Sequence, residues 1–274
     1  MTTIDDVAYR TIDGITLLAR LYRPNTNGPD TSGPVRWMID VHGGAWGSGD
    51  RLNNTVIHED LAAHGVGVCA LDFRLSDEAQ YPAMVDDVNY GIRWFKAQAE
   101  TLDVEMSMLG ALGSSSGAQQ MGLVALCPAA ARWTTLDPEL TMVDASVDFF
   151  VAAWPILDPL ARYRMVQEAD NERLVAAHDA CFASEADMTE GNPYLLLDRG
   201  EATHTPPMAI IQGTADANVE YTLQDKFADL YRSKGGHVEV HKFDGQPHTF
   251  VTADPEADAS KEAIVKIREF VLRV

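Results

Sequence analysis

The strongest chemical signal in the sequence is a serine between two glycines, Gly113-Ser114-Ser115-Ser116-Gly117. An apolar run at 106–112 precedes it, and a helix-compatible segment at 118–126 follows it. A G-x-S-x-G sequence between a strand and a helix is typical of a nucleophile elbow, a turn so tight that the residues flanking the serine must lack bulk. The sequence therefore predicts that Ser115 is a nucleophile, with the positive N-terminal end of a helix directed at it.

A second signal is the segment His42-Gly43-Gly44-Ala45-Trp46, which directly follows the apolar run 37–41. Glycines after a strand let backbone N–H groups come close to a ligand oxygen. Such N–H groups stabilise the negative charge that develops on a carbonyl oxygen under attack. The segment is therefore a candidate oxyanion hole.

An acid and a base complete the arrangement when they follow the serine in the order acid, then histidine. Asp216 lies in the loop after the apolar run 208–211, and His248 lies in the loop after the run 238–243. Asp158, in the loop after the preceding strand, is the rival acid. We predict Ser115, Asp216 and His248 as the catalytic residues.

Parallel strands connected by helices are expected to position these loops, because short apolar runs alternate with segments of helical periodicity. The segments 7–11 and 15–22 form an expected hairpin around Asp13-Gly14. About 50 residues separate the last two inner strands, more than one crossover needs. We interpret 156–200 as an insertion over the strand ends, with an amphipathic stretch at 161–182. The alternative is a crossover helix with additional residues and no role in substrate binding. The expected strands are 37–41, 66–71, 106–112, 147–153, 208–211 and 238–243.

Composition limits the function classes. The chain has 274 residues, 46% of them hydrophobic, and a net charge of −20, which fits one domain (1–274) and argues against nucleic-acid or anionic-membrane partners. It shows no apolar run long enough to span a membrane and no secretory signal. The three cysteines, Cys69, Cys127 and Cys181, form no C-x-x-C pair and are read as packing residues of a cytoplasmic protein. The sequence leaves a homodimer open.

Taken together, these motifs resemble the α/β-hydrolases of the hormone-sensitive-lipase-like group, especially its compact bacterial acetyl/feruloyl esterase-type members. The resemblance implies an α/β-hydrolase fold with a mostly parallel eight-stranded sheet, helices on both faces and a small lid at 156–200. It implies the same triad, and an oxyanion hole formed by the N–H groups of Gly44, Ala45 and Ser116. Two positions depart from the usual pattern, because Ala45 replaces a third glycine and Ser116 replaces a common alanine.

The function expected from these residues is hydrolysis of a carboxylic ester, with a short-chain or aromatic acyl group, through an acyl-enzyme. No metal or cofactor is required. The same triad also cleaves amides, formamides, carbamates and lactones, so those small-molecule substrates stay open. Two further alternatives are a non-catalytic binding protein and a peptidase of the prolyl-oligopeptidase type, although 274 residues leave no room for the latter's extra domain. Candidate pocket residues are aromatic or apolar: Trp46, Phe73, Trp154, Tyr163 and Met165. Arg74 and Asp87 are expected to form a structural pair.

Overall fold

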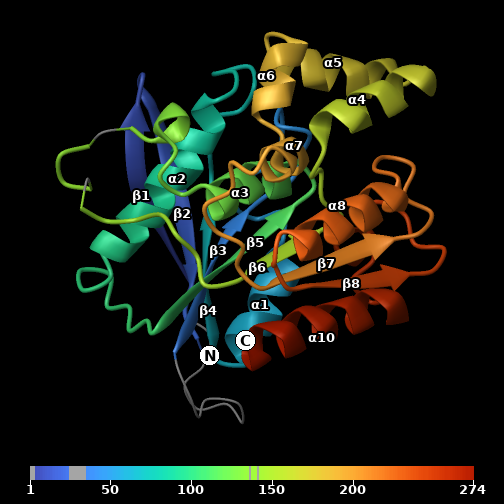
Figure 1. The fold of residues 1–274 in the computed structure, drawn as a ribbon. Helices are drawn as coiled ribbons and strands as arrows, with labels where there is room; N and C mark the ends of the chain where they lie inside the picture. The colour runs from blue at the N-terminus through green and yellow to red at the C-terminus, as the bar shows by residue number, and fades with distance from the viewer. Residues whose placement is uncertain (1–3, 25–34, 136, 141) are drawn as a thin grey trace.

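A computed structural model describes residues 4–24, 35–135, 137–140 and 142–274, and its centre is one eight-stranded sheet (Figure 1). The strand order is β1-β2-β4-β3-β5-β6-β7-β8. Strands β3 to β8 pair in parallel, whereas β2 pairs antiparallel with β1 and β4. The strands are β1 (Ile4–Ile12), β2 (Ile15–Tyr22), β3 (Arg36–Val41), β4 (Val66–Leu71), β5 (Met108–Ser114), β6 (Phe150–Ala153), β7 (Met208–Gly213) and β8 (Val238–Phe243). The predicted mostly parallel sheet is confirmed.

The hairpin between β1 and β2 is confirmed at its predicted turn. Asp13 and Gly14 both have positive φ, 51° and 83°, as a two-residue turn that matches the right-handed strand twist requires. Several predicted strands differ at their ends, β5 and β6 among them. β5 begins two residues later than expected and extends to Ser114, and β6 begins only at Phe150.

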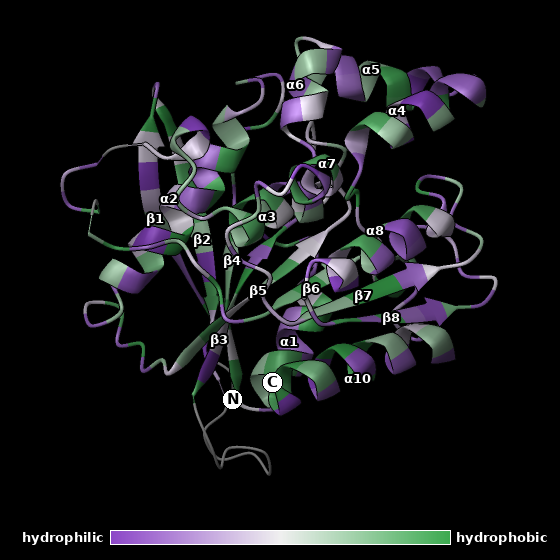
Figure 2. Ribbon diagram, in the orientation of Figure 1, coloured by the Kyte–Doolittle hydropathy of each residue, from purple (hydrophilic) through white to green (hydrophobic). Residues whose placement is uncertain are grey.

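Helices cover both faces of the sheet, and each face has its own core. On one face α1 (Thr55–Ala63) and α10 (Asp258–Arg273) bury Leu61 and Ile267. On the other face α2 (Ala83–Ala97), α3 (Ser116–Leu126) and α8 (Tyr221–Ser233) bury Val88, Met121 and Phe227. Figure 2 shows hydrophobic and hydrophilic residues alternating along α10, as one buried helix face requires. A 3₁₀ turn, η1 (Ala131–Trp133), and the short α9 (Phe250–Ala253) complete the helices of the described residues.

The insertion between β6 and β7 contains four helices, of which the first three lie at the carboxyl end of the strands and the fourth packs against α3 and α8 (Figure 1). They are α4 (Pro159–Glu168), α5 (Glu172–Cys181), α6 (Glu185–Glu190) and α7 (Pro193–Asp198). The stretch 161–182 is therefore two helices. Asp170 has φ of 51°, and the Asn171 side chain accepts the Leu174 N–H as the N-cap of α5. This local turn ends the first helix and starts the second.

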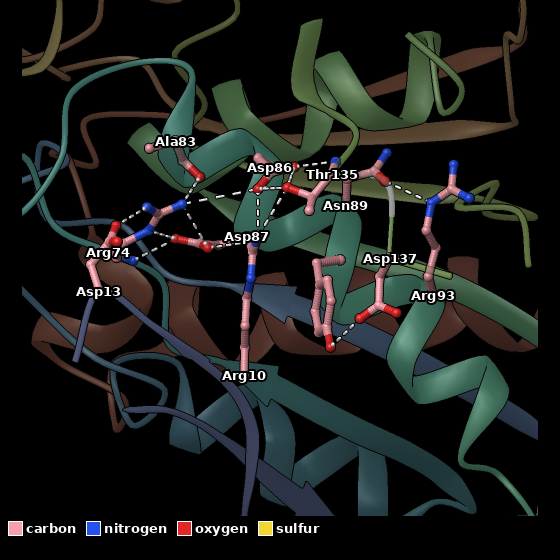
Figure 3. A network of polar contacts seen from close by, with 11 residues as sticks. Arg10, Asp13, Arg74, Ala83, Asp86, Asp87, Asn89, Arg93, Thr135 and Asp137 are labelled. Atoms are coloured by element: carbon pink, nitrogen blue, oxygen red, sulfur yellow. Dashed lines mark hydrogen bonds and ion pairs between the residues drawn. The ribbon is translucent and has the colours of Figure 1, made fainter. Parts of the chain in front are cut away.

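The predicted pair of Arg74 and Asp87 belongs to a larger buried network, drawn in Figure 3. Arg74 Nε donates to Asp87 Oδ2 over 2.8 Å, and its Nη2 donates to Oδ1 over 3.1 Å. Arg10 from β1 donates to the carboxylates of both Asp86 and Asp87. The network thus ties β1 and the loop after β4 to helix α2.

Cys69, Cys127 and Cys181 are buried and unpaired, as predicted for packing residues. The helices of the described residues include none with the length and apolar character needed to span a bilayer.

Candidate active site

Ser115 occupies a strained turn between β5 and α3. Its φ of 50° and ψ of −116° lie outside the regions favoured by residues with side chains. The flanking glycines are needed for space: a Cβ atom at Gly117 would lie 2.1 Å from the carbonyl oxygen of Val41, and one at Gly113 would lie 2.7 Å from Ala118 Cα. The predicted elbow is therefore present, and its glycines are sterically required.

The structure brings together the three predicted catalytic residues from loops far apart in the sequence. Ser115 Oγ lies 2.9 Å from His248 Nε2, and His248 Nδ1 lies 2.7 Å from Asp216 Oδ2. In this arrangement Nδ1–H donates to the carboxylate, which leaves the lone pair of Nε2 facing the serine hydroxyl. The geometry is suited to removing a proton from Ser115.

The carboxylate of Asp216 is fully buried and saturated with donors. Oδ1 accepts the N–H groups of Asn218 and Val219 over 2.8 and 2.9 Å, and Oδ2 accepts from Gln212 Nε2 as well as from His248. Burial alone would raise the pKa of Asp216, but the hydrogen bond and charge of His248 and the two backbone donors lower it below its usual range. Asp216 therefore stays ionised.

The alternative acid, Asp158, caps a helix of the insertion. Its Oδ1 accepts the N–H of Ala161 over 2.9 Å as the N-cap of α4, and it also accepts from Asn192 Nδ2 over 2.7 Å. Its side chain is thus used to hold the insertion.

The predicted oxyanion loop has an unusual backbone. Gly44, Ala45 and Trp46 all have positive φ, 123°, 51° and 63°. The Gly43 N–H donates to Ser114 Oγ over 2.9 Å, and the Trp46 N–H donates to Ser116 Oγ over 3.2 Å. Gly44 and Ala45 lie between these two residues, and within the described part of the chain neither of their N–H groups has an acceptor.

The N–H of Ser116, the first residue of α3, precedes the first hydrogen bond of the helix. The three predicted N–H groups, those of Gly44, Ala45 and Ser116, thus remain available to a ligand.

A buried polar cluster supports this loop, and no motif in the sequence predicts it. Asn54 Nδ2 donates to Ser114 Oγ over 3.0 Å and to Asp40 Oδ1 over 3.0 Å. His58 Nε2 lies 2.9 Å from Asp40 Oδ2. Ser114 therefore connects the oxyanion loop to side chains from β3 and α1, which fixes the loop relative to the neighbouring nucleophile.

A cavity of about 400 Å³ opens above Ser115 and His248. Gly44 and Ala45 of the oxyanion loop and Arg173 and Leu174 of α5 are among the residues that line it. Of the predicted pocket residues Trp46, Trp154, Tyr163 and Met165, only Trp154 contributes to the cavity wall.

The other three predictions require correction. Trp46 is fully buried, with its indole N–H bonded to Gln119 Oε1 and its ring against His178 and Phe182. Tyr163 faces α5, where its hydroxyl donates to Asp179. Met165, also on α4, lies outside the cavity wall.

Phe73, a fifth candidate, stacks on His42 at a centroid distance of 4.3 Å. The apolar residues near the site thus mostly pack the insertion and the loops; few of them face the cavity.

The insertion is connected to the acid loop by Arg162 of α4, a fully buried cation. Arg162 Nε donates to the backbone oxygen of Asn218 over 3.1 Å, and its Nη2 donates to Asn218 Oδ1 over 2.5 Å. Asn218 in turn donates its N–H to Asp216. On the other side, Arg162 Nη1 lies 3.3 Å from Nε2 of His178 on α5. A chain of contacts thus runs from the insertion to the candidate acid.

Comparison with known proteins identifies the family. A family model described as BD-FAE matches residues 21–230. The chain belongs to the BD-FAE family. The chain is also 31% identical to the ethyl acetate hydrolase of Pseudomonas putida, over 97% of this chain and 81% of that protein.

Solved structures agree on the BD-FAE fold. The propionate-bound esterase 2 of Thermogutta terrifontis superposes with a TM-score of 0.76 at 22% identity, covering 98% of this chain and 93% of that one. The paraoxon-phosphorylated form of the same esterase superposes with a TM-score of 0.76 at 20% identity, again covering 98% of this chain and 93% of that one. The predicted hormone-sensitive-lipase-like α/β-hydrolase and its class, a serine-dependent carboxylic ester hydrolase, are thereby confirmed.

Proposed function

We propose that this BD-FAE protein hydrolyses short-chain carboxylic esters through an acyl-enzyme on Ser115, with His248 as general base and Asp216 as its orienting acid. The observation that carries the proposal is the continuous hydrogen-bond chain from Ser115 Oγ through both nitrogens of His248 to Asp216. A serine hydroxyl is weakly nucleophilic by itself, and such a chain is what activates it.

In the first half of the reaction, Ser115 Oγ attacks the ester carbonyl while His248 Nε2 takes its proton. The carbonyl oxygen becomes an oxyanion and accepts hydrogen bonds from the N–H groups of Gly44, Ala45 and Ser116. These donors are fixed before the substrate arrives, so little reorganisation is needed as charge develops. Asp216 stabilises the imidazolium that forms. Collapse of the intermediate releases the alcohol, which takes the proton from His248.

In the second half, His248 removes a proton from water, and the hydroxide attacks the acyl carbon on Ser115. The oxyanion forms in the same place. His248 then returns the proton to Ser115 Oγ, and the carboxylic acid leaves. Protons and bonds balance over the two halves, and the enzyme is regenerated.

A short acyl chain is favoured by the size and lining of the cavity. Its volume of about 400 Å³ lies at the small end of ligand sites. Its walls carry mainly serine, threonine and asparagine side chains, with Trp154 and Leu174 as the large apolar groups. The similarity to an ethyl acetate hydrolase supports the same conclusion.

The test is a series of p-nitrophenyl esters from acetate to palmitate, assayed with the wild type, Ser115→Ala and the control Ser233→Ala. Ser233 is an exposed serine on α8, distant in sequence from every site residue. We expect kcat/KM to be highest for the shortest acyl chains and Ser115→Ala to lose about 10⁴-fold or more. Substantial activity in Ser115→Ala, or a preference for palmitate, would contradict the proposal.

A further inference from the structure

Arg173 is a cation on the wall of the cavity without an acidic partner. It lies in the first turn of α5, it is exposed, and it lines the same cavity as Ser115 and His248. No carboxylate of the described residues lies within ion-pair distance of its guanidinium. This is unusual in a chain with 41 acidic residues against 21 lysines and arginines, where most surface cations find a carboxylate.

The cavity wall carries no carboxylate at all among the described residues. Apart from Arg173 and His248, its polar side chains are neutral, including Ser48, Asn53, Asn218 and Thr252. The acid of the site, Asp216, is fully buried and bonded to His248 and to the backbone of its own loop. Carboxylates are thus absent from the described surface of this cavity in a strongly acidic protein.

A second cation lies behind the same wall. Arg162 is fully buried, and its hydrogen-bond partners among the described residues, Asn218 and His178, are neutral. Burial lowers the pKa of Arg162 to about 10; Asp216 opposes this effect, and the charge of Arg173 adds to it. The two arginines therefore lie close enough to repel one another. Positive charge gathered around a cavity of neutral polar groups favours an anionic ligand.

We propose that the site takes esters that carry a carboxylate group, and that Arg173 is the specificity-determining residue that binds this carboxylate. The proposal rests on the proposed function, since it names the substrate class of that same site. A guanidinium binds a carboxylate through two parallel hydrogen bonds, which fix orientation as well as adding affinity. Because Arg173 projects from the insertion, the remote charge is recognised separately from the reacting carbonyl. We therefore expect substitution of Arg173 to change KM for a charged ester more than kcat.

The experiment compares two matched pairs of esters. Monoethyl succinate is ethyl butyrate with the terminal methyl of the acyl chain replaced by a carboxylate. Acetoxyacetate is ethyl acetate with the terminal methyl of the alcohol side replaced by a carboxylate. The quantity measured is the selectivity ratio, kcat/KM for the anionic ester divided by kcat/KM for the neutral one. The proteins are the wild type, Arg173→Gln, Arg173→Lys and the control Arg164→Gln, an exposed arginine of α4 outside the cavity wall.

We expect Arg173→Gln to lower the ratio about tenfold or more in at least one pair, with KM changing more than kcat. Arg173→Lys retains part of the preference, because the charge remains without the bidentate geometry. Raising the salt concentration lowers the wild-type ratio, since the contact is solvent-accessible. Arg164→Gln leaves the ratio within about twofold.

A ratio that changes less than twofold in both pairs in Arg173→Gln, or that falls equally in Arg164→Gln, overturns the carboxylate proposal. A wild type that hydrolyses both neutral esters and neither anionic one overturns it too. In each of these cases Ser115-dependent hydrolysis of neutral esters leaves the proposed function standing. If the wild type hydrolyses none of the four esters, the proposed function fails, and this inference fails with it.

Discussion

Protonation of His178 is expected to destabilise the insertion below pH 6.5. The His178 side chain is fully buried between α4 and α5. Its Nδ1–H donates to the backbone oxygen of Leu174 over 2.8 Å, so Nε2 presents its lone pair to Arg162 Nη1. A proton on Nε2 would face a guanidinium N–H. Burial, and next the charge of Arg162, lower the pKa of His178 from 6.5 to about 4, although hydrogen bonds to the backbone of Leu174 and Pro159 and the charge of Asp179 oppose this.

The sign and size of the effect follow from linkage. The unfolded chain binds a proton at His178 near pH 6.5 and the folded chain only near pH 4, so stability falls as the pH drops through this window. A shift of this size corresponds to about 3 kcal/mol when complete, and about 2 kcal/mol is already lost at pH 5. Above pH 7 the residue is neutral in both states and contributes no pH dependence.

The assay is urea-induced unfolding of the wild type, His178→Gln and the control His237→Gln at pH 8 and pH 5. His237 lies at the surface before β8. The wild type and His237→Gln are expected to lose about 2 kcal/mol more between the two pH values than His178→Gln does. Hydrogen exchange of the α5 amides would locate the loss. Equal losses in His178→Gln and the wild type would refute the reasoning.

Four further substitutions test other parts of the structure. Asp216→Asn is expected to lower kcat about 10⁴-fold in the ester assay, because the amide favours the wrong histidine tautomer. Asp158→Asn keeps an oxygen that can cap α4, so its kcat is expected to stay within about threefold of the wild type in the same assay. Asp87→Ala removes the fully buried carboxylate that two buried arginines, Arg10 and Arg74, share, and is expected to cost about 3–5 kcal/mol in urea unfolding; a loss below about 1 kcal/mol would contradict this. Gly117→Ala places a methyl group against the main-chain oxygen of Val41. We therefore expect about 1–3 kcal/mol of destabilisation and a large fall in kcat/KM. If stability and kcat/KM are both unchanged, the elbow does not require a glycine at this position.

The parts of the site that depend on backbone geometry could be predicted from sequence. Gly113 and Gly117 are informative because no other residue fits the space beside them, and Asp216 and His248 follow strands whose apolar pattern is clear. Strand order then brings these loops to one edge of the sheet.

Side-chain partners across the fold could not be predicted in the same way. Trp46 is a predicted pocket residue because it is aromatic, but its indole is buried beneath α5. Nothing in the local sequence of Arg162 or Asn218 indicates a role, since the two residues meet from segments that are distant in the chain. Asn54 was missed for the same reason. Hydrophobic periodicity describes which face of a helix is buried, but it does not say which polar groups meet there.

The hydrogen bonds between Arg162 and Asn218 limit how the insertion can be exchanged for another. In principle α4 to α7 form a cassette between two strands, and a different cassette would bring a different substrate preference to the same sheet. However, a graft that lacks a donor equivalent to Arg162 would leave the backbone and side-chain oxygens of Asn218 without a partner beside the candidate acid. Engineering of new specificities on this scaffold therefore has to treat the insertion and the loop after β7 as one unit, to be transplanted together.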